Sequence, residues 1–158
     1  MANPRADRPD MPEYGIVPAG EARLLDWSWG RERLEATRNY WLATTRPDGR
    51  PHAAPVWGLW FDDRLFFSTS GVKARNLDAR PDCVVTTESG AEAVIVEGHA
   101  ARLRDVARLR PLIEAYSDKY AFEMSVDGYE YWLLEPRVAF GFIEASDQFQ
   151  QTATRWTF

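Results

Sequence analysis

The chain has 158 residues, of which 45% are apolar and 27% charged, which is enough for one globular domain with a core. Its net charge of −5 argues against nucleic acid or an anionic membrane as a partner, because both are bound through clustered Lys and Arg, so any anion site must be local. One cysteine and two histidines exclude an internal disulfide and a metal site built from Cys and His. The sequence contains neither an apolar run of membrane-spanning length nor a signal-peptide pattern, so we expect a cytoplasmic protein.

Residues 1–26 are expected to form a tail or strap, because four prolines and scattered charges leave little apolar surface to bury. A single domain is expected over residues 27–158. A short helix is predicted from Ser28, whose hydroxyl can cap the first turn, to about Asn39. Trp27 and Leu34 are seven residues apart and share one face, so this helix should lie across one end of a sheet.

A β-hairpin follows. Residues 40–45 are aromatic and β-branched, and the Pro-Asp-Gly sequence after them is typical of a tight turn. The return strand, residues 51–61, is apolar on both faces, whereas a half-solvated antiparallel strand would alternate. A barrel wall, a subunit interface or a bound ring must therefore cover its second face. Pro55 has no amide hydrogen and favours an edge or a bulge, where neighbouring backbone groups can bind a ligand.

The hairpin pattern continues along the chain. A turn at Asp62 and Asp63, whose carboxylates we expect to be solvated, precedes the next strand. Gly98 is expected to mark a β-bulge in the long strand predicted over residues 93–103. The further strands are predicted over residues 64–69, 83–87, 93–103 and 137–145.

Two helices are predicted between these strands. One covers residues 72–79, and the other covers residues 106–120, where apolar side chains recur three and four positions apart. Pro111 lies within the second helix, which should either begin near Arg110 or be kinked, since a proline in a helix interior costs about 3 kcal/mol. Six strands in hairpin succession with minor helices predict a mainly β protein, a small antiparallel barrel.

Residues that suit a phosphate follow the third strand. Hydroxyls, a flexible glycine and the free amides of a helix start can surround a phosphate, and two cations supply the opposite charge. An ordinary solvated helix cap uses the same residue types, so both interpretations stay open. The residues are Ser68, Thr69, Ser70, Gly71, Lys73, Arg75 and Asn76.

A second group lies on the return strand of the hairpin. His52 could make a polar contact or carry a proton, or it could simply be exposed. Trp57 could be a platform for a ring or a core residue. Cys83 has no cation near it in sequence and is interpreted as a structural thiol. Motifs of serine hydrolases, ATPases and Rossmann dehydrogenases are missing from the sequence.

Four segments of this chain occur in an order that resembles a known superfamily. They are Asp48-Gly49-Arg50-Pro51-His52, Pro55-Val56-Trp57, Phe66-Phe67-Ser68-Thr69 and Lys73-Ala74-Arg75-Asn76-Leu77. This order resembles the pyridoxamine 5′-phosphate oxidase-like split β-barrel superfamily, and within it the flavin/deazaflavin oxidoreductases common in actinobacteria. The resemblance covers residues 27–97, 136–144 and 154–158.

The resemblance implies a homodimer of six-stranded split barrels, with FMN or the deazaflavin coenzyme F-420 in clefts along the interface. The phosphate would be held by Lys73 and Arg75 with two hydroxyls, and a tryptophan near the C-terminus would approach the ring. Relatives often have a further cation before the lysine, where this chain has Val72, so phosphate affinity is lower or Arg50 contributes. The implied cofactor-binding residues are Arg50, His52, Pro55, Val56, Trp57, Ser68, Thr69, Lys73, Arg75, Asn76 and Trp156.

We expect an oxidoreductase that transfers a hydride between this cofactor and a small conjugated organic substrate, because the chain offers little acid–base machinery of its own. The resemblance alone favours the deazaflavin over FMN. One alternative is a non-catalytic protein that binds or sequesters the cofactor. Another is an FMN oxidase of the pyridoxamine 5′-phosphate oxidase type, although the Arg-Trp-Thr-Phe ending departs from the usual C-terminus of that enzyme.

Overall fold

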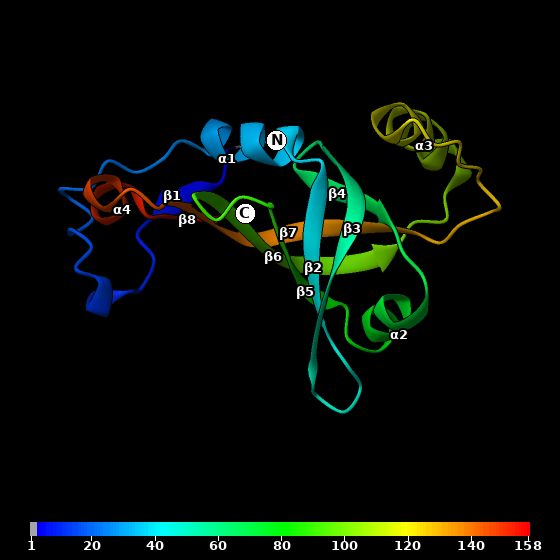
Figure 1. Ribbon diagram of the computed structural model, residues 1–158, viewed down its shortest axis with the longest axis horizontal. Helices are drawn as coiled ribbons and strands as arrows, with labels where there is room; N and C mark the ends of the chain where they lie inside the picture. Colours follow the sequence, from blue (N-terminus) through cyan, green and yellow to red (C-terminus); the bar gives the residue numbers. More distant parts are fainter. Residues whose placement is uncertain (1–2) are drawn as a thin grey trace.

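The computed structural model describes residues 3–158 and contains a closed barrel of six antiparallel strands (Figure 1). The order around the barrel is β7-β4-β3-β2-β5-β6, and pairing of β6 with β7 closes it. The six-stranded antiparallel barrel predicted from the sequence is therefore confirmed. The strands are β2 (Asn39–Thr45), β3 (Pro51–Phe61), β4 (Arg64–Ser68), β5 (Asp82–Thr86), β6 (Glu92–Arg102) and β7 (Tyr131–Ile143).

The last barrel strand differs most from its predicted bounds, since β7 begins at Tyr131 and not at residue 137. Pro136 lies inside this strand opposite Gly98, and the register shifts here because Arg137 of β7 has no partner between the pairs Glu97–Val138 and Gly98–Pro136. An irregularity is therefore present beside Gly98, but its extra residue belongs to β7, where it accommodates a proline that donates no hydrogen bond to the ladder. A Cβ atom at position 98 would lie 2.4 Å from the carbonyl oxygen of Glu135, which restricts this position to glycine.

Helix α1 (Trp27–Ala36) is capped by a carboxylate. Asp26 accepts a hydrogen bond from the amide of Ser28 at 2.8 Å, so the prediction that the Ser28 hydroxyl caps this helix is wrong. The Trp27 indole donates to Asp63 at 2.8 Å. Asp63, which was expected to be solvated, instead anchors α1 to the turn between β3 and β4.

Two helices lie at one end of the molecule, on the right in Figure 1. Helix α2 (Gly71–Ala79) connects β4 to β5, and α3 (Val106–Tyr120) connects β6 to β7. Helix α3 has the bounds predicted for it, continues through Pro111 and is capped by Asp105, so the alternative of a start near Arg110 is wrong. Within residues 3–158, no helix is long and apolar enough to cross a membrane.

The N-terminal and C-terminal segments lie together on the opposite side of the molecule, on the left in Figure 1, where β1, α4 and β8 are labelled. Strand β1 pairs with β8, and β8 pairs with β7, so both extend the sheet beyond the barrel. The Arg8 guanidinium donates to the carbonyls of Gln150 and Ala153, which binds the N-terminal segment to the C-terminal one. The elements here are β1 (Arg5–Asp7), a 3-10 helix (Pro12–Tyr14), α4 (Ser146–Thr152) and β8 (Thr154–Thr157).

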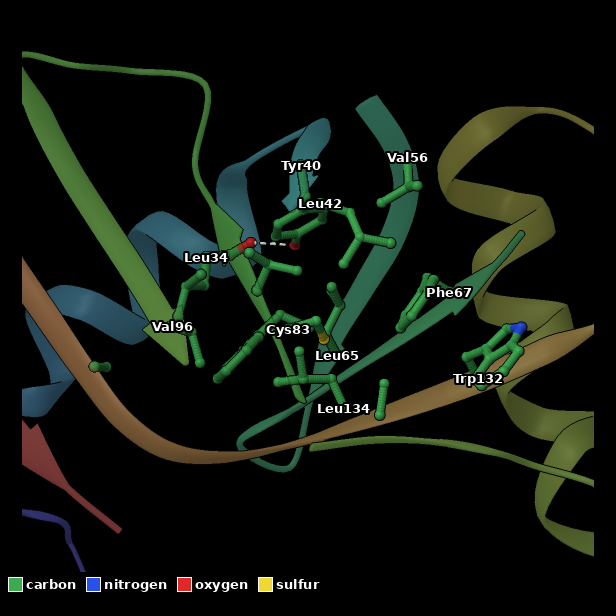
Figure 2. Packing of buried hydrophobic residues seen from close by; sticks show 14 of the residues in the cluster. Leu34, Tyr40, Leu42, Val56, Leu65, Phe67, Cys83, Val96, Trp132 and Leu134 are labelled. Atoms are coloured by element: carbon green, nitrogen blue, oxygen red, sulfur yellow. Dashed lines mark hydrogen bonds between the residues drawn. The ribbon is translucent and has the colours of Figure 1, made fainter. Parts of the chain in front are cut away.

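Buried side chains form two clusters. Cys83 lies in the larger one, where burial raises the pKa of its thiol to about 12, in agreement with a structural role. The smaller cluster packs α3 against β4 and β7 and includes Phe66, Leu109, Ile113, Tyr116 and Tyr131. The larger cluster fills the barrel and includes Leu42, Val56, Leu65, Val96 and Leu134 (Figure 2).

Candidate functional site

A pocket of about 320 Å³ lies between β3, β4, the start of α2, and α3 with the loop that follows it. Its walls contain six of the residues predicted for the cofactor site, from two segments that are separate in sequence. The structure therefore brings the predicted ring and phosphate segments to one space. The pocket is lined by Pro55, Val56, Trp57, Ser68, Thr69, Ser70, Lys73, Tyr116, Phe122, Met124 and Tyr129.

One end of this pocket is the start of α2. Ser70 occupies the N-cap position, but its side chain makes no capping hydrogen bond, so the first-turn amides are free to meet a ligand. The Thr69 side chain is 7% exposed, and its Oγ1 has no hydrogen-bond partner among the residues that the structure describes. Leaving a buried hydroxyl without a partner costs about 1–3 kcal/mol. A ligand oxygen beside Thr69 would remove this cost.

The charge and rigidity of this end come from a few neighbours. Lys73 is the one residue among the described lining residues that is charged at neutral pH, so the pocket is locally positive although the chain carries −5. Ser68 Oγ donates to the carbonyl of Glu130 at 3.0 Å, and the Thr69 amide donates to the same carbonyl at 3.3 Å. One carbonyl thus fixes the end of β4.

The other end of the pocket is aromatic. The Trp57 indole, 39% exposed, stacks on Tyr120 with ring centroids 4.5 Å apart and planes 6° from parallel. Phe122 meets Trp57 edge-on at 5.7 Å. The amide of Gly58 donates to the Tyr120 hydroxyl at 2.8 Å, which fixes the phenol beneath the stack. A rigid, partly exposed aromatic surface of this kind suits a flat ring system.

Lys119 holds α3 against this aromatic end. Its Nζ donates to the carbonyls of Thr37 and Gly58, at 2.7 and 2.9 Å. Burial, with the charge of Arg38 nearby, lowers the pKa of Lys119 to about 8. The tie between α3 and β3 therefore contains an ammonium group that loses its proton close to neutral pH.

Two predicted residues on α2 point away from the pocket. Arg75 is exposed two positions after Lys73, and residues two apart on a helix do not share a face. Asn76 is buried, and its Nδ2 donates to Thr44 Oγ1 at 2.9 Å. Asn76 thus fixes α2 to β2 and is not available to a ligand.

Three other predicted residues lie elsewhere. Arg50 is exposed and pairs with Asp48 at 2.8 Å. His52 is partly buried, and its Nδ1 has no partner within residues 3–158. Trp156 is fully buried against Trp27 in the core, on β8 at the end opposite α2 and α3 (Figure 1). A ligand could reach Trp156 only by opening the core, so we leave it out of the site.

Four lining residues were missed by sequence reasoning. Tyr116 comes from α3, and Phe122, Met124 and Tyr129 come from residues 121–130, a segment with no periodic pattern. The available signal was composition, because several large apolar residues in an otherwise polar loop indicate a binding surface.

Comparison with known proteins identifies the family. The family model described as pyridoxamine 5′-phosphate oxidase matches residues 30–142, so the chain belongs to this family, and the resemblance found in the sequence is confirmed. No curated protein matches the chain.

Solved structures share the fold at low identity. An F-420 reductase is 22% identical, with a TM-score of 0.57, over 69% of this chain and 94% of its own. A conserved hypothetical protein from Mycobacterium tuberculosis is 18% identical, with a TM-score of 0.69, over 89% and 91%. A heme storage protein from Vibrio cholerae is 18% identical, with a TM-score of 0.55, over 68% and 87%. These neighbours have diverse functions, and at such identities they show the fold alone.

Replacing Lys119 by methionine should change how stability depends on pH. The folded protein releases the Lys119 proton near pH 8, whereas the unfolded chain holds it until about pH 10.5. Between these two pH values the unfolded state binds more protons than the folded state. The free energy of unfolding of the wild type should therefore rise with pH, relative to that of Lys119→Met. Urea unfolding of both proteins at about pH 7 and about pH 9.5 measures this difference. A difference that stays constant or falls with pH would contradict the assignment.

Proposed function

We propose that this protein is a flavin- or deazaflavin-dependent oxidoreductase that transfers a hydride between its cofactor and a small conjugated organic substrate. The observation that carries the proposal is the buried, unpartnered hydroxyl of Thr69 beside the uncapped start of α2, in a pocket whose opposite wall is aromatic. One end suits a phosphate and the other a flat ring. The family and the F-420 reductase among its structural neighbours support a cofactor of the flavin type.

The residues of the pocket take definite roles in this proposal. The first-turn amides of α2, Thr69 Oγ1 and Lys73 would bind the phosphate of FMN or of coenzyme F-420. Pro55 and Trp57 would line the ring. When bound, the cofactor supplies the hydride chemistry. The described lining residues include no carboxylate and no imidazole, so the chain itself contributes orientation, charge at the phosphate and exclusion of water.

We further propose a homodimer, because the outer face of β2, β3 and β5 is apolar and exposed. Trp41 is 48% exposed and pairs with Pro55 across the two strands. A hollow of about 470 Å³ continues this face, with Ala43 and Val84 in its lining and the charged residues Asp82, Glu97 and Arg137 among the others. Exposed apolar patches of this kind mark interaction sites. Pro55 also lines the pocket, so a second subunit seated on this face would lie beside the ring end.

A non-catalytic binding or sequestering protein is the second candidate. It is favoured by the heme storage protein among the structural neighbours and by the shortage of acid–base groups in the pocket lining. Such a protein would use the same phosphate end but would have no room for a substrate beside the ring.

Turnover separates the two candidates. The purified protein is titrated with FMN and with coenzyme F-420, and the reduced, bound cofactor is then mixed with enones, quinones or tetrapyrroles. If the protein is an oxidoreductase, at least one of these acceptors should oxidise the bound cofactor faster than it oxidises the free cofactor. Binding without acceleration across the whole panel would favour the sequestering protein, and binding of neither cofactor at micromolar concentration would exclude both.

Lys73 and Arg75 provide a matched pair of cations on one helix. Lys73→Ala should weaken binding of the phosphate-bearing cofactor by about 1.5–3 kcal/mol, the value of a charge-assisted hydrogen bond. Arg75→Ala should change it little, because Arg75 does not line the pocket. Fluorescence titration gives both affinities. Equal losses in the two variants would extend the phosphate site to Arg75, and no loss in either would move the site elsewhere.

Trp41→Glu should dissociate the proposed homodimer, because the substitution places a charge at the centre of the apolar outer face. Sedimentation velocity should show a shift from dimer to monomer, together with weaker cofactor binding. Tyr14→Glu changes an aromatic residue that is 60% exposed outside this face and should leave the dimer intact. A wild-type monomer, or a dimer unaffected by Trp41→Glu, would refute this interface.

A further inference from the structure

We propose that Arg102 is a positioning residue for the phosphate end of the pocket. It would act through the carboxylates of Asp78 and Glu130, two residues that are connected to opposite sides of this end. The inference rests on the proposed function, because it concerns the same site. Arg102 lies near the end of β6 and is not among the residues that line the pocket. Its effect on a ligand would therefore pass through Asp78 and Glu130.

The Arg102 guanidinium uses all three nitrogens. Nε and Nη2 donate to the two carboxylate oxygens of Asp78 at 2.8 and 2.7 Å, and Nη1 donates to Glu130 Oε1 at 2.7 Å. The guanidinium carbon lies 4.6 Å from the ring centroid of Trp132, which covers one face of the group. The hydrogen bonds from Arg102 hold the pKa of Asp78 below its usual range, which agrees with an ionised pair. Among protein side chains, only the planar guanidinium group of arginine can make these three hydrogen bonds at once.

Each carboxylate partner is connected to one side of the phosphate end. Asp78 lies in the last turn of α2, the helix whose first turn contributes the free amides and Lys73. Glu130 offers its main-chain carbonyl to the Ser68 hydroxyl and the Thr69 amide. Arg102 therefore sets the position of the end of β4 relative to α2. A phosphate would have to fit between these two sides.

The attachment of α2 to the barrel does not depend on Arg102 alone. Ala74 and Leu77 are buried in the core, and Asn76 is bonded to Thr44. Loss of Arg102 should therefore leave α2 folded and docked but free to pivot about these contacts. Small displacements of this kind weaken a preorganised binding site without unfolding the protein.

Arg33 provides a matched control. Its side chain is 24% exposed, against 25% for Arg102, and it also pairs with a carboxylate at 2.7 Å, that of Glu92. Its guanidinium lies over Trp29 at 3.9 Å, as Arg102 lies over Trp132. Neither Arg33 nor its partners line the pocket. Arg33→Gln therefore removes a similar stacked ion pair at a place unconnected with the phosphate end.

The test compares FMN with riboflavin, which has the same ring and no phosphate. Affinities are measured for the wild type, Arg102→Gln, Arg102→Lys and Arg33→Gln, and urea unfolding of each variant measures its stability. Arg102→Gln should reduce the ratio of FMN to riboflavin affinity about tenfold, by analogy with the lower end of the effect of residues that orient metal ligands, and leave riboflavin affinity nearly unchanged. Arg102→Lys should lower this affinity ratio nearly as much, because an ammonium group cannot bind both carboxylates in the geometry of a guanidinium. Arg33→Gln should leave the ratio unchanged.

The possible failures are distinguishable. Equal losses for FMN and riboflavin in Arg102→Gln, an unchanged ratio, or the same loss in Arg33→Gln would each overturn the role of Arg102. A wild type that binds neither flavin nor coenzyme F-420, or that shows no preference for the phosphate-bearing form, would instead overturn the proposed function. If the protein prefers coenzyme F-420, the same ratio is taken with its deazaflavin ring lacking the phosphate chain. Asp78→Asn removes only the α2 side of the link and should lower the ratio in the same direction, so the test stands even if Arg102→Gln does not fold.

Discussion

The pairing of β6 with β7 determines where the long connections of this protein can run. It closes the barrel in the order β7-β4-β3-β2-β5-β6, so β4 and β5 are consecutive in the chain but are separated by two strands. The chain must cross one end of the barrel between them, and α2 makes this crossing. Because α2 begins directly after β4, its free amides lie beside β3, where Pro55 and Trp57 are. The phosphate end and the ring end of the pocket adjoin because β3 pairs with β4 and α2 begins where β4 ends.

The sequence was informative where one physical requirement dominated. Strand β3 has apolar residues on both faces, and the structure places Val56 and Trp60 in the core and leaves Trp57 partly exposed. Thr69 and Lys73 could be assigned to one candidate site because hydroxyls, the free amides of a helix start and a cation are the groups that a phosphate requires. The cap of α1 was beyond such reasoning, since two residues able to cap, Asp26 and Ser28, lie two positions apart and only the backbone conformation decides between them.

Trp156 shows a different limit of sequence reasoning. A tryptophan near the C-terminus can face a ligand or the core, and the choice depends on space that distant residues leave. Here Gly141 leaves that space, because a Cβ at this position would lie 2.4 Å from the Trp156 ring. The Trp156 indole donates to the carbonyl of Leu25 at 3.1 Å, so its polar atom is also satisfied inside the protein. The aromatic wall of the pocket comes instead from Trp57, from α3 and from the loop after α3, and no local periodicity could predict the loop.

The electrostatics of the phosphate end set its mode of binding. Lys73 is its one cation among the described lining residues, and the exposed Arg75 does not line the pocket. Arg102 adds no net positive charge, because Asp78 and Glu130 together outweigh it by one. Recognition of a phosphate would therefore depend strongly on the α2 amides and the Thr69 hydroxyl. These groups must be placed accurately, because a hydrogen bond weakens steeply when donor and acceptor are misaligned. Affinity in such a site would follow from preorganisation, which is the physical basis of the role proposed for Arg102 outside the pocket.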